Sequence, residues 1–270
     1  MSSETRPVVV LAVPAADGLA LLADSAHPLA PWVERVTAVA VGIPDDLADA
    51  DERGAESTVL VAALARRFPA ARWFATASFS RDFPYNLARR IGSLSNTARS
   101  RVGVALVPGP TTVPTTRTAT AEDTVVAGSA ALSALWESWP LDSIVADRER
   151  RLFVDSSRIV RVDQDDVFAV RGPLQVPVDA ARKPPIAVWA DHPLPGTELA
   201  FAPDGTVRRT DGHVVGTVVS GDTPTALRAL DAAGEPASGP SLDLREALGL
   251  GASEPVLVGA PAAFVSEVPR

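Results

Sequence analysis

Short continuous apolar runs alternate along the first half of the chain with stretches in which apolar residues recur every three or four positions. Continuous runs are typical of strands buried on both faces, and the longer spacing is typical of helices with one buried face. The pattern predicts strands at 7–13, 36–43, 72–77 and 102–107. It predicts helices within 18–35, at 56–68, at 84–96 and from about 122.

The helix at 56–68 ends before Pro69, and the helix at 84–96 begins with a proline that suits its first turn. The inner face of the first is predicted at Val59, Leu60, Ala63 and Leu64. The inner stripe of the second is predicted at Leu87, Ile91 and Leu94.

The fourth predicted helix, from about 122, ends at Pro140, after an apolar face formed by Leu132, Leu135, Trp136 and Trp139. Two short strands, 158–162 and 167–171, follow around the polar turn 163–166. Gly172-Pro173 ends this unit. We expect an insertion at about 147–174 whose hairpin lies outside the main sheet.

The second half predicts more strands than helices. The strands are expected at 185–190, 198–202, 214–219 and 255–258, and the helices at 223–233 and 242–248. Asp243 and Glu246 are spaced as a capping pair on the last helix, and Gly249 suits its C-terminal cap. Eight parallel strands with shortened late helices predict a compact α/β (β/α)8 barrel, with residues 1–270 as one domain. The alternative is a doubly wound open sheet, which normally has a glycine fingerprint after its first strand, and 14–18 is not one.

Composition excludes several classes of partner and chemistry. The net charge is −8 and no Lys/Arg cluster is present, so a nucleic-acid partner is not expected. The absence of cysteine excludes disulfides, thiolate metal sites and a cysteine nucleophile. No apolar run approaches the roughly 18 residues of a membrane span, and the start lacks a signal-peptide pattern. We therefore expect a cytoplasmic protein.

Side chains that could act in catalysis or bind a metal are scattered along the chain. The common phosphate-binding, metalloprotease and nucleophile motifs are missing, and we expect no metal site from the distant histidines, His27, His192 and His213. The run 163–166 lacks the glycine and glutamate of a calcium loop, so it is interpreted as a solvated turn. Glu137 and Asp142 are interpreted as a solvated helix end. The five tryptophans are interpreted as core or interface anchors rather than flavin-stacking groups.

Three segments together resemble a known family. The first is an LW-S-W helix end at 135–139 with Asp147, a hairpin ending in F-V-GPL at 168–174 and an apolar strand at 185–190. The second is Ala75-Thr-Ala-Ser78 followed by 84–89 and 93–94, and the third is the LRE-LGL segment within 243–250. They resemble the nitrilotriacetate monooxygenase branch of the bacterial luciferase-like flavin monooxygenases. The resemblance implies reduced FMN at the C-terminal mouth of the barrel, with Thr76 and Ser78 as cofactor-binding residues. It identifies no catalytic residue.

The sequence departs from the family where phosphate and flavin are held. The fourth strand and its turn, 104–109, lack the family's Asn and Thr-Ser, and 99–101 replaces its Gly-Gly-Arg turn. The family's His-x-x-Arg-Tyr motif has no counterpart in residues 117–124 of this chain. Asp191-His-Pro193 stands where the family has a phosphate-binding Ala-Gly-Ser-Ser. The chain is therefore most similar to the family's short auxiliary chains, such as the small subunit of pristinamycin IIA synthase.

This resemblance leaves three hypotheses. The first is an auxiliary subunit of a two-component, reduced-FMN-dependent monooxygenase in secondary metabolism, supplied by a flavin reductase. The second is an active monooxygenase with altered flavin ligands, which Arg99, Arg101 or Arg117 could supply. The third is a non-enzymatic barrel that binds another small molecule. The resemblance also implies a dimer through helices 56–68 and 84–96, either with itself or with a longer luciferase-like chain.

Overall fold

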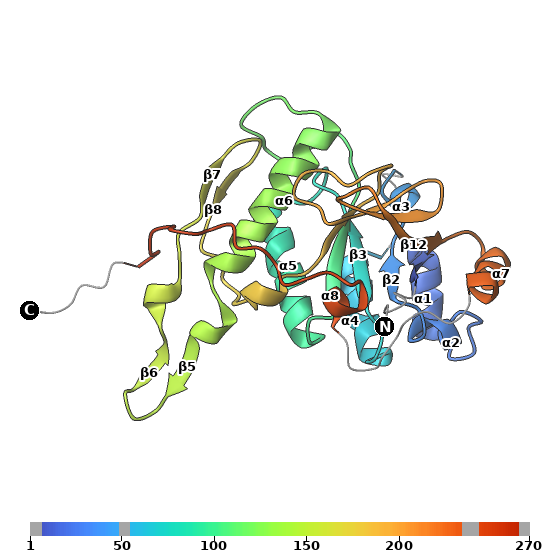
Figure 1. The fold of residues 1–270 in the computed structure, drawn as a ribbon, viewed down its shortest axis with the longest axis horizontal. Helices are drawn as coiled ribbons and strands as arrows, with labels where there is room; N and C mark the ends of the chain where they lie inside the picture. The colour runs from blue at the N-terminus through green and yellow to red at the C-terminus, as the bar shows by residue number, and fades with distance from the viewer. Residues whose placement is uncertain (1–6, 49–54, 234–242, 265–270) are drawn as a thin grey trace, which may run out of the picture.

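The computed structural model describes residues 7–48, 55–233 and 243–264. Its centre is a closed barrel with the strand order β1-β12-β11-β10-β9-β4-β3-β2 (Figure 1). These strands are β1 (Val8–Val13), β2 (Ala38–Val41), β3 (Trp73–Ala77), β4 (Val102–Leu106), β9 (Ile186–Val188), β10 (Leu199–Phe201), β11 (Thr206–Arg209) and β12 (Val214–Val219). The closed barrel with helices confirms the predicted α/β barrel, and excludes the open-sheet alternative.

One strand breaks the parallel arrangement that we expected. β11 runs antiparallel to both β10 and β12, while the other neighbouring strands are parallel. The predicted strand at 255–258 does not form, and this segment lies exposed along the surface instead. The short hairpin from β10 to β11 supplies the eighth strand in its place. The prediction of eight parallel strands was therefore wrong at β11 and its two neighbours, β10 and β12.

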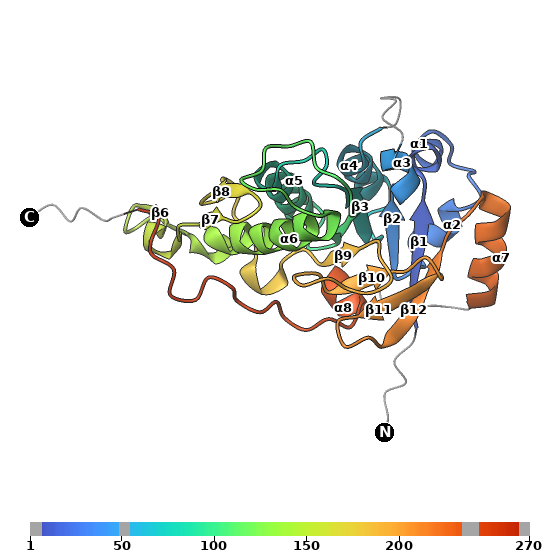
Figure 2. The ribbon, with the colours of Figure 1, turned by 90° about the horizontal axis from the view of Figure 1, so that it is seen from above.

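Helices cover the β1–β4 half of the barrel, and β9 to β11 are joined without them (Figure 2). The helices are α1 (Ala15–Ala23), α2 (Ala30–Val33), α3 (Pro44–Ala48), α4 (Ser57–Arg67), α5 (Pro84–Thr97), α6 (Ala121–Ser138), α7 (Thr223–Ala233) and α8 (Leu244–Ala247). The outer side chains of β11 and β12 include Thr206, Arg208 and Thr217, which are partly or fully exposed. Because an antiparallel hairpin can face water on one side, this polar sector folds without a helical layer.

The ends of two helices follow from their capping residues. Thr120 and Asp123 form a reciprocal capping box on α6, and Asp243 and Glu246 form the predicted one on α8. Gly249 follows α8 with φ of +64°, as predicted for its C-terminal cap. Leu244 and Leu248 pack with the residues inside the barrel, so α8 closes its N-terminal end.

The buried face of α4 differs from the prediction. Leu60, Val61 and Leu64 are buried, but Val59 is 65% exposed and Ala63 is also exposed. The run 59–65 is apolar almost throughout, so its periodicity does not distinguish one face from the next. The consequence is an apolar patch on the outer surface of α4.

The insertion after α6 forms two hairpins outside the barrel, where the sequence predicts one (Figure 1). The first joins β5 (Ile144–Asp147) to β6 (Leu152–Val154), and the second joins β7 (Asp163–Asp165) to β8 (Ala169–Arg171). The predicted turn at 163–166 is mostly strand, because β7 begins later than expected. Short 3-10 helices occur at Leu141–Ser143, Ser156–Arg158 and Ala180–Arg182. Within the described residues, no helix is long and apolar enough to cross a membrane.

Candidate functional site

The C-terminal mouth of the barrel lies above Thr76, one of the two residues that the sequence places in a cofactor site. Phe74 belongs to the cluster inside the barrel, and strand alternation turns Thr76 to the same side. Thr76 is 2% exposed, and its hydroxyl donates to the Gly42 carbonyl oxygen at 2.7 Å. The indole Nε1 of Trp189 lies 3.4 Å from the same hydroxyl oxygen. The Thr76 hydroxyl is therefore engaged within the chain.

Ser78, the second predicted cofactor residue, lies at the end of β3 and is 4% exposed. Its hydroxyl donates to the Val107 carbonyl oxygen at 2.9 Å and accepts from the Ser80 amide at 3.2 Å. The structure thus brings Thr76 and Ser78 to the same end of the barrel, and their contact with a cofactor stays a prediction. Sequence reasoning did not anticipate that both hydroxyls have internal partners, because Gly42 and Val107 lie on other strand ends.

Aromatic rings fill the barrel beneath the mouth. Trp189 packs edge-on against Phe201 at 5.2 Å between ring centroids, and Phe201 packs edge-on against Phe74 at 5.2 Å. Trp73 and Trp136 are fully buried in the layer between barrel and helices. Trp73 and Trp136 are thus core anchors, as the sequence indicates, whereas Trp189 is only partly buried.

The loops at the mouth are acidic. One carboxylate oxygen of Asp46 accepts from the amides of Ala15 at 3.0 Å and Ile43 at 2.9 Å, which joins the ends of β1 and β2. Asp191 follows β9 and is exposed. Further aspartates occupy other loops and helix starts at this end, namely Asp17, Asp45, Asp82, Asp204 and Asp222. Asp82 and Asp204 are paired with Arg90 and Arg208, so the negative charge that opposes a phosphate group at the described part of the mouth comes from the other aspartates.

Local contacts shift the pKa values of several of these carboxyl groups in opposite directions. Burial raises the pKa of Asp82, although Arg90 lies 2.5 Å away and opposes the shift. Hydrogen bonds from Thr206 lower the pKa of Asp204, and hydrogen bonds from Thr225 lower the pKa of Asp222. Among the residues described, no group of three histidine or acidic side chains could hold a metal ion.

The three arginines considered as alternative flavin ligands do not converge. Arg99 and Arg101 precede β4, so they lie at the N-terminal end of the barrel, opposite the mouth. Arg117 lies in the loop after β4, on the mouth side, and pairs with Asp166 at 2.9 Å. The hypothesis that Arg99 or Arg101 supplies a flavin ligand is therefore wrong.

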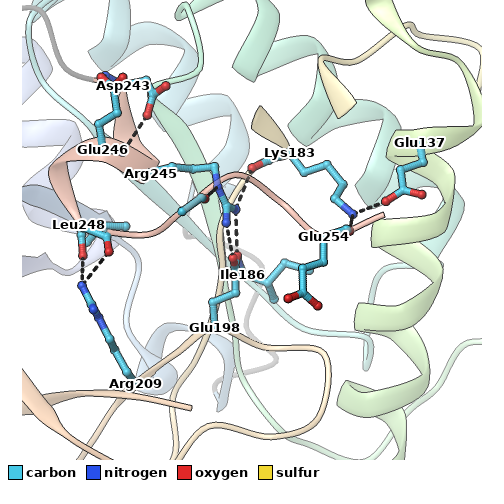
Figure 3. Close-up of polar contacts among 12 residues, drawn as sticks. Glu137, Lys183, Ile186, Glu198, Arg209, Asp243, Arg245, Glu246, Leu248 and Glu254 are labelled. Atoms are coloured by element: carbon cyan, nitrogen blue, oxygen red, sulfur yellow. Dashed lines mark hydrogen bonds and ion pairs between the residues drawn. The ribbon is translucent and has the colours of Figure 1, made fainter. Parts of the chain in front are cut away.

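A second polar site lies at the N-terminal end of the barrel (Figure 3). Glu137 is 8% exposed, contacts the Lys183 ammonium group and accepts from the amides of Val256 and Leu257 at 2.8–2.9 Å. The Lys183 ammonium group also donates to the Glu254 carbonyl oxygen at 2.8 Å. The interpretation of Glu137 as solvated was wrong, because a segment far along the chain covers it. Asp142 is exposed as expected and pairs with Arg158 at 2.7 Å.

A further hollow lies on the outer surface of α4 and α5, with a volume of about 600 Å³. Its lining combines apolar side chains with two arginines, and includes Val59, Ala62, Leu94, Val176, Arg89 and Arg90. This surface coincides with the two helices that the resemblance implies as a dimer interface.

Comparison with known proteins identifies the class of fold. No protein-family model and no curated protein matches the chain. The solved structure of EDTA monooxygenase (EmoA) from Chelativorans sp. BNC1 matches with a TM-score of 0.50 and 21% identity, over 68% of this chain and 49% of that one. Long-chain alkane monooxygenase (LadA) matches with a TM-score of 0.54 and 16% identity, over 69% and 52%. Riboflavin lyase (RcaE), solved with modified FMN and riboflavin, matches with a TM-score of 0.55 and 18% identity, over 69% and 51%.

The chain therefore shares an α/β barrel fold with these three proteins, and it spans about half the length of each of them. Sequence identities at this level show a shared fold.

Proposed function

We propose that this chain is the auxiliary subunit of a two-component, reduced-FMN-dependent monooxygenase, with a degenerate flavin site of its own. The proposal rests on one observation: the hydroxyl groups of both predicted flavin-binding residues already donate hydrogen bonds within the chain. The Thr76 hydroxyl is bonded to Gly42 beside Trp189, and the Ser78 hydroxyl is bonded to Val107. A flavin ring would have to displace these bonds before it could use either hydroxyl.

The described residues at the mouth do not fit an FMN phosphate. Phosphate capture needs convergent backbone amides together with positive charge. The mouth loops instead place Asp191 after β9, and the Asp46 carboxylate already occupies the amides of Ala15 and Ile43. We therefore derive no catalytic step for this chain, and we assign the oxidation to a longer partner supplied by a flavin reductase. The sequence resemblance supports the nitrilotriacetate monooxygenase branch and a place in secondary metabolism.

The partner surface that we propose is the outer face of α4 and α5. Val59 is 65% exposed there, next to the small, exposed side chain of Ala62. Small side chains allow another helix to approach closely, and the adjoining Leu94 and Val176 extend the apolar contact. A stable interface on this surface should bury about 1,000 Å² or more in total. The partner is a longer luciferase-like chain or a second copy of this one.

An active monooxygenase with altered flavin ligands is the second candidate. Of the arginines considered for it, Arg117 is the one on the mouth side, and its pairing with Asp166 would have to break. A non-enzymatic barrel that binds another small molecule is the third candidate. Like the first, it agrees with a mouth in which the described residues form no phosphate site.

Visible absorbance of the purified protein, before and after FMN is added and removed by gel filtration, separates these candidates. The auxiliary-subunit proposal predicts no retained flavin in the isolated chain. It also predicts that a longer luciferase-like chain co-purifies from the native host and has higher monooxygenase activity when this chain is present. Retained flavin with activity in the isolated chain would favour the active enzyme instead.

A further inference from the structure

The hairpin formed by β5 and β6 extends away from the barrel, and we call its residues 144–154 the arm (Figure 1). In both ribbon views the arm lies at the end of the molecule opposite α7 (Figure 2). Phe153 on β6 is 68% exposed, and Leu152 and Val145 are 41% and 45% exposed. An isolated two-stranded hairpin is only marginally stable in water, and apolar side chains gathered on an exposed surface indicate contact with another molecule.

The outer edge of β6 has no strand partner, because β6 pairs only with β5 among the described residues. The amide of Asp155 donates across this pair to the Ser143 carbonyl oxygen at 2.8 Å. The register advances by three residues along β5, from 144 to 147, and by two along β6, so β6 is the regular strand. Since successive residues of a strand direct their backbone groups to alternate sides, Leu152 and Val154 present theirs on the outer edge.

The stretch 151–155 is complementary to itself when two copies of the chain run antiparallel. A two-fold axis at Phe153 places Leu152 of one copy opposite Val154 of the other. The same axis brings the two Phe153 side chains together at the centre and places Arg151 opposite Asp155 at both ends. Apolar and oppositely charged cross-strand pairs each stabilise an antiparallel sheet.

The charged groups of the arm are available for this pairing. Arg151 is exposed and has no carboxylate partner in the part of the chain that the structure describes. Asp155 accepts from the amide and hydroxyl of Ser157 through Oδ1, which leaves Oδ2 for the second copy. Residues 142–158 contain four acidic and four basic side chains, whereas the whole chain has a net charge of −8. Two arms can therefore approach without the repulsion that other surfaces of this acidic chain would produce.

We propose that two copies of this chain join through their arms, with the two β6 strands paired antiparallel about Phe153 in a four-stranded sheet. Leu152 and Val154 exchange backbone hydrogen bonds across the axis, and the two Phe153 rings pack on one face of the sheet. The three residues of β6 form an interface smaller than the roughly 1,000 Å² of a stable dimer, so we expect a dissociation constant of about 100 µM or weaker. This contact uses a different surface from α4 and α5 and does not depend on the auxiliary-subunit proposal.

Disulfide trapping tests the pairing directly, because the chain has no cysteine and a single substitution introduces a single thiol. In Phe153→Cys the two thiols would meet at the axis, where a non-hydrogen-bonded antiparallel pair has Cα atoms about 4.5 Å apart, within the range of disulfides. With oxidised glutathione as the oxidant, this variant should form the linked dimer about tenfold faster than Val145→Cys. Val145 is the matched control, because it is exposed on β5 of the same arm and away from the axis. Non-reducing gel electrophoresis measures both rates, and equal rates would overturn the proposal.

The charge pairs are tested in the Phe153→Cys background. Arg151→Glu would place two carboxylates opposite each other at both ends of the pairing, and it should slow trapping by about threefold or more. Arg148→Glu is the control, because Arg148 is exposed in the turn of the same arm and lies outside the paired stretch. Equal slowing by the two substitutions would indicate a general effect of charge and would refute the register about Phe153.

Discussion

The Thr76 hydroxyl donates to the Gly42 carbonyl oxygen at 2.7 Å and thereby joins the interior of β3 to the end of β2. A side chain added at Gly42 would lie 3.1 Å from the Thr76 Cβ and 2.4 Å from the Ser57 hydroxyl oxygen, so the two strand ends are closely packed. This packing makes Thr76 part of the barrel's own structure. It is the reason why a residue that fits a flavin-binding pattern need not bind flavin here.

Gly216→Ala should destabilise the protein strongly. The added Cβ would lie 1.8 Å from the Val8 carbonyl oxygen, and this backbone contact between β12 and β1 cannot relax by side-chain rotation. We expect a loss of about 3 kcal/mol in the free energy of unfolding, measured by urea denaturation. Gly251→Ala is the control, because nothing lies within 4 Å of its Cβ, and it should change stability by about 0.5 kcal/mol or less. Similar stabilities of the two variants would contradict the strand register.

Glu137→Ala should cost about 3–5 kcal/mol in the free energy of unfolding, because it leaves the Lys183 charge buried and unpaired. It also releases the amides of Val256 and Leu257. Asp142→Ala is the control, since its pair with Arg158 is exposed and should contribute about 1 kcal/mol or less. The double variant Glu137→Leu with Lys183→Met should be more stable than Glu137→Ala. A loss for Glu137→Ala no larger than that for Asp142→Ala would contradict the burial of this pair.

These contacts show which parts of the molecule local sequence patterns can predict. Continuous apolar runs such as Val8–Val13 identified the buried strands, and the spacing of Asp243 and Glu246 identified the cap of α8. β11 was missed because Thr206–Arg209 is short and polar, and only its pairing with two neighbours makes it a strand. The environment of Glu137 depends on Lys183 and on residues 254–257, which no local pattern connects to it. The resemblance placed Thr76 and Ser78 at the mouth, but the bonds of their hydroxyls depend on neighbouring strands.

The pH dependence of stability should have opposite signs for Asp82 and Asp123. Burial raises the pKa of Asp82, so the native state holds this proton more tightly than the unfolded state does. Relative to Asp82→Asn, the wild type should therefore lose stability as the pH rises from below the usual value of 3.8 through the raised pKa.

Hydrogen bonds from Thr120 lower the pKa of Asp123, so its contribution is present above the usual value of 3.8. Relative to Asp123→Asn, the wild type should lose stability as the pH falls through the lowered pKa. Denaturation of the three proteins over the acidic range measures both trends. The same sign of pH dependence for the two positions would refute the assignment.

Ala62→Glu combined with Ala65→Arg should convert a dimer into a folded monomer. The changes place charges on α4, one at Ala62 beside the exposed Val59 and one at the partly buried Ala65, where the proposed interface requires an apolar, closely packed surface. Sedimentation velocity of wild type and variant measures the effect, and circular dichroism checks the fold. Ala232→Glu on α7 is a control on another exposed helix surface and should leave the dimer intact. A wild type that sediments as a monomer at micromolar concentration, with no homologous chain co-purifying from its host, would count against this surface.

The most direct test of the auxiliary-subunit account is the affinity of the isolated chain for FMN, measured by titration calorimetry. Because we find no phosphate site among the described residues of the mouth, we expect a dissociation constant of about 10 µM or weaker, where each 1.4 kcal/mol corresponds to about tenfold. If this weak binding uses the mouth, Thr76→Val should weaken it further. Submicromolar binding of FMN by the isolated wild-type chain would contradict a degenerate flavin site and would indicate an active enzyme.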